Sequence, residues 1–108
     1  MEKKSGKEQA IERVREMTEI LERQREEIAA MKKALQTFED SQRSYQKLIK
    51  YYYSKQLHSD DRRWSRGELD ELQSVEVLSE DAVYDMMGDR YELTLDMLEL
   101  ATKLIRQR

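Results

Sequence analysis

Apolar residues recur every three or four positions from Val14 to Tyr52. This spacing places them on one face of an α-helix, where Gln24 and Gln42 are the two polar interruptions. A face this long predicts a helix that needs a partner helix along most of its length. The positions are Val14, Met17, Leu21, Gln24, Ile28, Met31, Leu35, Phe38, Gln42, Tyr45, Ile49 and Tyr52.

The C-terminal quarter of the chain predicts a second long helix, which is apolar over more than half of its circumference. Such a helix is expected to touch at least two neighbours. Its predicted start is a helix cap in which a serine is the N-cap, two acidic residues complement the helix dipole and two apolar residues form a staple. The cap residues are Leu78, Ser79, Glu80, Asp81 and Val83.

The predicted organisation is a flexible N-terminal tail at 1–6 and a single helical domain at 7–108. The domain consists of a long helix at about 7–39, a second helical segment at about 42–55, a loop at about 56–78 and a last helix at about 79–106. Within the predicted loop, Lys55–Arg66 is compatible with another short helical turn, and Gly67 marks a turn. An unbroken helix from 7 to 53 would be ~70 Å long, whereas the last helix reaches only ~45 Å. Either the first helix bends near Asp40–Ser44, or a second molecule covers the excess apolar surface.

Composition supports an all-α fold, which we expect to be an antiparallel helical bundle or coiled-coil-like hairpin. Proline is absent, only three glycines occur among 108 residues, and 40% of the residues are charged. The absence of cysteine excludes disulfides and thiolate metal sites. Neither a signal peptide nor a membrane-spanning apolar run is recognisable, so a cytoplasmic protein without a membrane partner is expected.

Charge is distributed unevenly along the chain. Residues 47–67 carry a surplus of basic residues, and residues 68–99 hold eleven acidic residues against Arg90 alone. Basic and aromatic residues alternate at the end of the second helical segment, a pattern that can hold phosphates and stack bases. We interpret this candidate interaction surface first as an internal plug or docking surface, and otherwise as a site for a partner protein or a nucleic acid. It comprises Tyr51, Tyr52, Tyr53, Lys55, Arg62, Arg63, Trp64 and Arg66.

Carboxylates on the last helix are spaced to share one face, which could bind a divalent cation. They are Asp81, Asp85, Asp89 and Glu92. A catalytic metal site would need a second acidic motif facing them, and the first helix offers only scattered glutamates. His58 is the single histidine and has no companion ligand. We therefore predict no catalytic residue, no metal and no cofactor.

Four segments occur in an order that resembles the domain-of-unknown-function family 4298, small helical proteins of mainly Gram-positive bacteria. The segments are Ile11–Met17, Tyr51–Ser54 with Asp60 downstream, Gly67–Leu72 and Val77–Asp85. The resemblance extends from about Gln9 to Leu104, and its more specific part is the Leu-Ser-Glu-Asp segment with the preceding Tyr-Tyr-x-Ser. It implies an intracellular helical protein and transfers no activity.

The sequence is best interpreted as a non-enzymatic protein–protein interaction or scaffolding module. Its expected partner is another protein or a second copy of itself, as in a homodimer. A nucleic-acid-associated factor that uses residues 50–66 is the first alternative. A metal-dependent enzyme or regulatory subunit that uses the acidic face of the last helix is the second.

Overall fold

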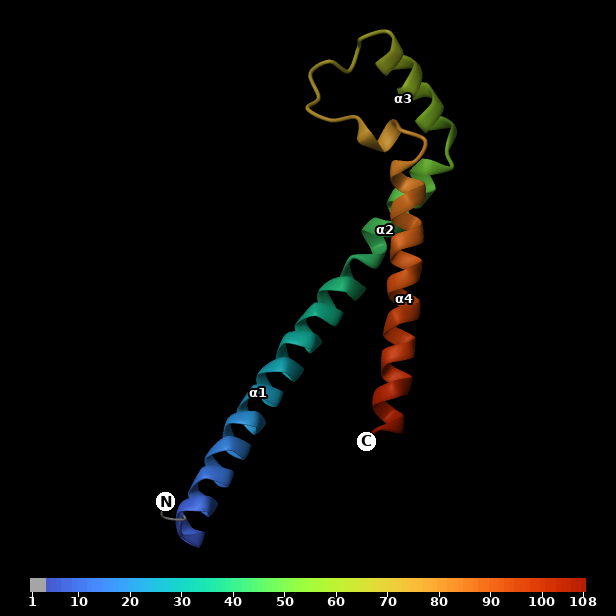
Figure 1. Ribbon diagram of the computed structural model, residues 1–108. Helices are drawn as coiled ribbons and strands as arrows, with labels where there is room; N and C mark the ends of the chain where they lie inside the picture. Colours follow the sequence, from blue (N-terminus) through green and yellow to red (C-terminus); the bar gives the residue numbers. More distant parts are fainter. Residues whose placement is uncertain (1–3) are drawn as a thin grey trace. The chain divides into compact units, whose positions relative to one another are not determined.

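The predicted long helix is α1 (Gly6–Asp40), drawn as one continuous helix in Figure 1. It contains the positions of the apolar face from Val14 to Phe38. The structure, a computed structural model, describes residues 4–108. The Ser5 side chain caps the helix by accepting a hydrogen bond from the Glu8 backbone N–H at 3.1 Å. The predicted tail at 1–6 thus overlaps the cap and the first helical residue, and residues 1–3 lie outside the described part of the chain. No residue of α1 is buried.

A single residue, Ser41, separates α1 from α2 (Gln42–Tyr52). The Ser41 backbone N–H is shared between the carbonyls of Thr37 and Phe38, and its hydroxyl donates to the Phe38 carbonyl at 2.6 Å. A serine hydroxyl that bonds to the preceding turn competes with the regular helical pattern and often bends a helix. The interruption falls within Asp40–Ser44, where a bend was one of the two alternatives left open by the sequence.

The chain then forms α3 (Lys55–Ser65), so the predicted loop at 56–78 is wrong for residues 56–65. The Ser54 hydroxyl accepts from the Leu57 backbone N–H at 3.3 Å and provides the N-cap. Because this cap starts a new helix, the second helical segment ends at Tyr52 rather than near 55. The helix was obscured in the sequence because its residues are mostly polar and present few apolar positions.

Gly67 ends α3 in a left-handed conformation with φ of 77°. Its backbone N–H donates to the Trp64 carbonyl at 2.9 Å, and the Glu68 N–H donates to the Arg63 carbonyl at 3.0 Å. This pair of bonds is a Schellman motif, in which glycine avoids the steric cost that a Cβ would bring. The chain continues without regular structure to the short 3₁₀-helix η1 (Glu76–Leu78).

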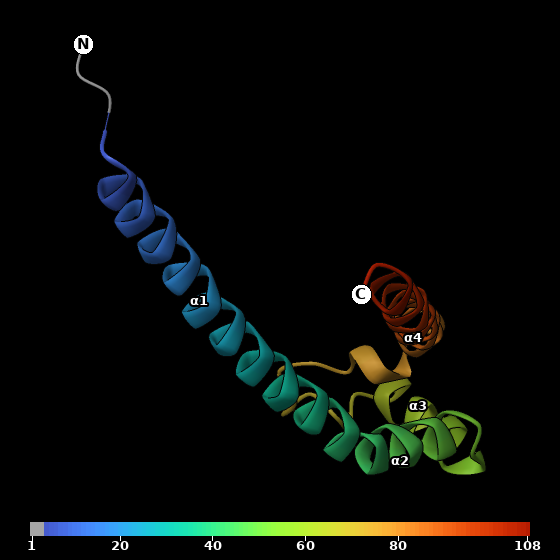
Figure 2. The same cartoon turned by 90° about the horizontal axis from the view of Figure 1, so that it is seen from below.

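The last helix is α4 (Ala82–Arg106), three residues shorter at its start than predicted. Its N-cap is Asp81, which makes no side-chain cap bond, and not Ser79 as predicted. The Ser79 hydroxyl accepts from the Ala82 backbone N–H at 3.2 Å, which satisfies one of the free amides at the helix start. Val83, one residue further on, is only 4% exposed and is the one buried hydrophobic residue within 4–108. The start of α4 and η1 contact each other, and η1 also contacts α3 (Figure 2).

The described residues, 4–108, contain helices and turns but no strand, which confirms the all-α prediction. Contacts divide the chain into two compact units, where a single domain was expected. The N-terminal unit extends to Arg43, and the C-terminal unit comprises Ser44 to Arg108. In the C-terminal unit η1 contacts both α3 and α4, and the small core is centred near Val83 at the start of α4.

We expect Val83→Ala to lower the free energy of unfolding by about 2 kcal/mol, because it removes buried methyl groups from a core that cannot close completely. Urea unfolding followed by circular dichroism would measure the change. Leu72→Ala is the control, since Leu72 is exposed and its truncation should cost less than about 0.5 kcal/mol. Equal losses in the two variants would contradict a core centred on Val83.

Candidate functional site

A hydrogen-bonded corner joins α2 to α3. The Tyr51 hydroxyl donates to Asp60 Oδ2 at 2.7 Å, and Gln56 Nε2 donates to Asp60 Oδ1 at 3.0 Å. The Ser54 hydroxyl donates to the Tyr51 carbonyl at 2.6 Å while it caps α3. The corner is therefore fixed from both sides by side chains that the sequence places within ten residues of one another.

The corner shifts the pKa values of both groups in its central bond. Burial raises the pKa of Tyr51 to about 12, and the hydrogen bond and negative charge of Asp60 act in the same direction. The pKa of Asp60 is lowered because Tyr51 and Gln56 donate to its carboxylate, with Arg63 contributing by charge. Each group thus favours the protonation state that keeps the Tyr51–Asp60 bond, with a neutral phenol and an ionised carboxylate.

Tyr52 and Tyr53 lie next to this corner and differ in their surroundings. The Tyr52 hydroxyl donates to the Glu80 carbonyl at 3.4 Å, which links the end of α2 to the segment before α4. The Tyr53 ring meets the Tyr52 ring edge-on with centroids 5.0 Å apart, and Tyr53 is 71% exposed. A pocket of about 370 Å³ lies beside these rings, with His58 and Asp61 in its wall.

The basic residues of the candidate interaction surface are dispersed along α3. Glu68 accepts from Arg63 at 3.2 Å and forms an ion pair with Arg66 at 3.6 Å. Lys55 and Arg62 are exposed, and Trp64 is 47% exposed. The eight predicted residues therefore all lie on or next to α2 and α3. Tyr51 belongs to the hydrogen-bonded corner and Tyr52 bonds to the Glu80 carbonyl, whereas Tyr53 and Trp64 are exposed.

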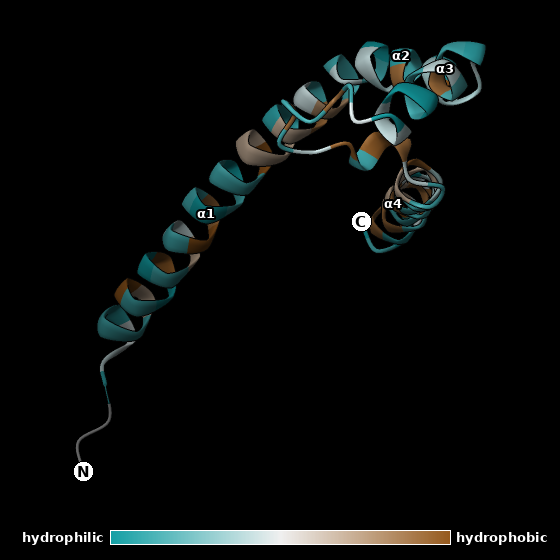
Figure 3. Ribbon diagram, turned by 90° about the horizontal axis from the view of Figure 1, so that it is seen from above, coloured by the Kyte–Doolittle hydropathy of each residue, from teal (hydrophilic) through white to brown (hydrophobic). Residues whose placement is uncertain are grey.

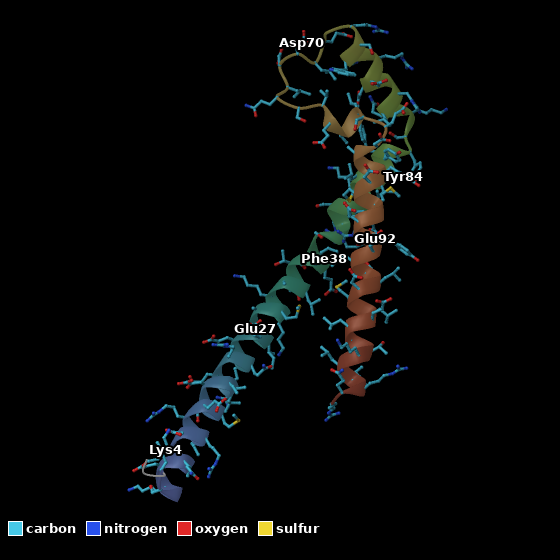
Figure 4. All side chains as sticks on the ribbon, in the orientation of Figure 1. Lys4, Glu27, Phe38, Asp70, Tyr84 and Glu92 are labelled. Carbon is cyan, nitrogen blue, oxygen red and sulfur yellow. The ribbon has the colours of Figure 1, made fainter. Side chains whose placement is uncertain are left out.

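The largest exposed apolar feature of the N-terminal unit is a seam along α1. Eight large apolar side chains are each 45–65% exposed. Figure 3 shows the apolar residues gathered along one side of α1, and Figure 4 shows the side chains of this helix as sticks between the labelled Lys4 and Phe38. The α1 seam comprises Ile11, Val14, Met17, Ile20, Leu21, Ile28, Met31 and Leu35.

In the C-terminal unit, α4 carries an exposed stripe with a spacing of seven residues. Its members are 64–74% exposed, and Tyr84 projects outward from the helix (Figure 4). A spacing of seven keeps them on one face of the helix, which differs from the face of Val83 and Met97. The α4 stripe comprises Tyr84, Tyr91, Leu98 and Ile105.

Arg90, for which the sequence predicted no role, connects α4 to α2 within the C-terminal unit. Its guanidinium lies 4.3 Å from the centroid of the Tyr45 ring. A cation over an aromatic face is stabilised by the ring quadrupole. Arg90 is the lone base among the acidic residues at 68–99, and this isolation was the available signal for its role.

The acidic row of α4 does not assemble into a cluster. Across residues 4–108 no group of three or more histidine, aspartate or glutamate side chains is placed to hold a metal ion. None of the helices within the same residues combines the length and the apolar character of a membrane span.

The fold and its exposed faces define an all-α protein with two amphipathic helices whose apolar residues are largely uncovered. The sequence model of a family described as a domain of unknown function, DUF4298, matches residues 14–100. The chain belongs to this family, and the resemblance noted from its motifs is confirmed. Neither a curated protein nor a solved structure matches the chain.

We expect Tyr51→Phe to raise the pKa of Asp60 toward its ordinary value, because the variant removes the first of the two donors that lower it. A lowered carboxyl pKa stabilises the fold above the ordinary pKa, and this stabilisation is lost as the pH falls. The variant should therefore lose less stability on acidification than the wild type. Carboxylate NMR titration and thermal unfolding from about pH 6 to pH 2 would measure both effects.

Tyr53→Phe is the matched control, since the exposed Tyr53 is not part of the Tyr51–Asp60 bond. An unchanged Asp60 titration in Tyr51→Phe would show that the corner does not control this carboxylate.

Proposed function

We propose that this chain is a non-enzymatic protein–protein interaction module that binds another protein chain through the α1 seam. The observation that carries the proposal is the exposure of eight large apolar side chains along a single helix face. Contiguous apolar surface of more than a few hundred Å² is uncommon on monomeric proteins and marks interaction sites.

The lack of buried side chains in α1 supports the proposal. A helix of 35 residues without a buried side chain receives little stability from tertiary packing within its own unit. Its apolar residues occupy one face, and its charged residues occupy the remainder, as in helices that pack against a partner. Covering the α1 seam would remove this surface from water at about 25 cal/mol per Å².

The α4 stripe supports a second contact region on the same chain. Its two tyrosines combine a large apolar ring with a polar hydroxyl, a composition that is enriched at protein interfaces. A module with two such faces is suited to scaffolding, because each face can hold a different chain or segment.

Ile28→Glu should weaken association at least about tenfold, because a buried carboxylate without a partner costs more than ~1.4 kcal/mol. Ala29→Glu introduces the same charge on the neighbouring residue, away from the seam, and should leave association unchanged. Light scattering of the purified chain, and of stoichiometric complexes isolated from its own host, would measure the difference. Circular dichroism would check that both variants remain helical.

The proposal fails if the wild-type chain is a monomer at about 100 μM and no stoichiometric partner accompanies it from the host. It also fails if Ile28→Glu and Ala29→Glu reduce association equally, because the α1 seam would then not be the contact surface.

A further inference from the structure

We propose that the α1 seam binds the α1 seam of a second copy of this chain, with the two helices parallel and in register as a two-stranded coiled coil. This inference rests on the proposed interaction function and names its partner. Three observations favour this occupant: the position of one polar residue in the seam, the charges that flank the seam, and the area that the seam exposes.

The spacing of the seam defines a heptad repeat, labelled a to g, with apolar residues at positions a and d. Val14, Leu21, Ile28 and Leu35 occupy position a, and Met17, Gln24 and Met31 occupy position d. Identical positions face each other only when two copies of the helix are parallel and in register. Each layer of the coiled coil then contains the same residue from both copies, so the side-chain volumes match throughout the seam.

Gln24 distinguishes this arrangement from the alternatives. In the in-register parallel pair, the Gln24 amide meets the partner's Gln24 amide, and each can donate to the other. In an antiparallel pair centred on the seam, Gln24 faces Leu21 or Ile28 of the partner subunit and its polar atoms are buried without a partner. A single polar residue in an apolar seam sets the register of coiled coils by this difference.

The charges beside the seam favour the parallel pair as well. Glu27 is at position g and Lys32 at position e, so Glu27 lies next to the partner's Lys32, and twofold symmetry gives two such pairs. An antiparallel pair would instead place position e against position e. Arg25 would then lie close to the partner's Arg25 or to Lys32 of the partner subunit, which is a repulsive contact.

The exposed area is sufficient for a stable dimer. Eight large apolar side chains that are each about half exposed present on the order of 800 Å², which is what each partner contributes to a standard interface. The coiled coil would end near Ser41, because from Tyr45 onward the same heptad positions are occupied inside the C-terminal unit.

Engineered disulfides would test both the orientation and the register, since the natural chain has no cysteine. Met17→Cys and Leu35→Cys are made separately in the full chain and oxidised at micromolar concentration. In the parallel pair both sites meet their own copy, so each variant should form a covalent dimer in high yield. In an antiparallel pair at most one of these sites could do so. Glu19→Cys, on the opposite face of α1, is the control and should remain largely unlinked.

A charge exchange would test the flanking pairs. Lys32→Glu places a glutamate beside the partner's Glu27 twice per dimer, and the dissociation constant of the dimer should rise about fivefold. The double variant Glu27→Lys with Lys32→Glu restores opposite charges and should recover most of the wild-type affinity. Analytical ultracentrifugation at low and high salt would measure these constants, and salt should reduce the difference.

The inference is supported if the Met17→Cys variant and the Leu35→Cys variant each form a disulfide-linked dimer. A dimer that links at neither site, or equally at Glu19→Cys, overturns the parallel register while the interaction function stands. A wild-type chain that is monomeric at millimolar concentration overturns self-pairing. If that chain still forms a stoichiometric complex lost in Ile28→Glu, the proposed function survives with a different partner.

Discussion

The burial of apolar side chains along one heptad seam is the constraint on which the rest of this protein depends. The heptad repeat of the α1 seam continues into α2, but the burial of its side chains differs between the two helices. From Tyr45 onward, the side chains of α2 are half-buried within the C-terminal unit, where Arg90 of α4 covers the Tyr45 ring. From Val14 to Leu35, the same repeat remains about half exposed. Since water is a poor solvent for such a face, the unburied half is the strongest functional signal in the chain.

The C-terminal unit has few buried residues, and hydrogen bonds at its corners compensate for the small core. Ser54 caps α3 and bonds back to α2, and Tyr51 reaches Asp60 across the same corner. The Ser79 hydroxyl accepts from the Ala82 backbone N–H at the start of α4. These residues belong to the motifs by which the sequence resembles its family, and the structure gives them a structural role. These motif residues thus fix how the chain turns between helices.

Charged residues have different roles in the two units. Around α1 they form a solvated face and flank the α1 seam. In the C-terminal unit, Glu68 lies just beyond the Schellman turn at Gly67 and forms ion pairs with Arg63 and Arg66 at the end of α3, which offsets one of their two positive charges. This pairing reduces the positive potential that a nucleic-acid interface would need. The partial burial of Tyr51 and Tyr52 similarly removes two aromatic rings from the surface proposed for base stacking.

The sequence by itself determined the all-α class, the extent of α1, the glycine turn at Gly67 and the serine at the start of α4. Each of these follows from local periodicity or from the conformation of one residue, which neighbours in the chain are enough to define. The helix at Lys55–Ser65 and the division into two units were decided only by tertiary structure. The role of Asp60 depends on its hydrogen bond with Tyr51, and the role of Arg90 depends on its contact with the Tyr45 ring. Neither contact can be recognised in the sequence. Such contacts join residues on different helices, and a periodic pattern within one helix contains no information about them.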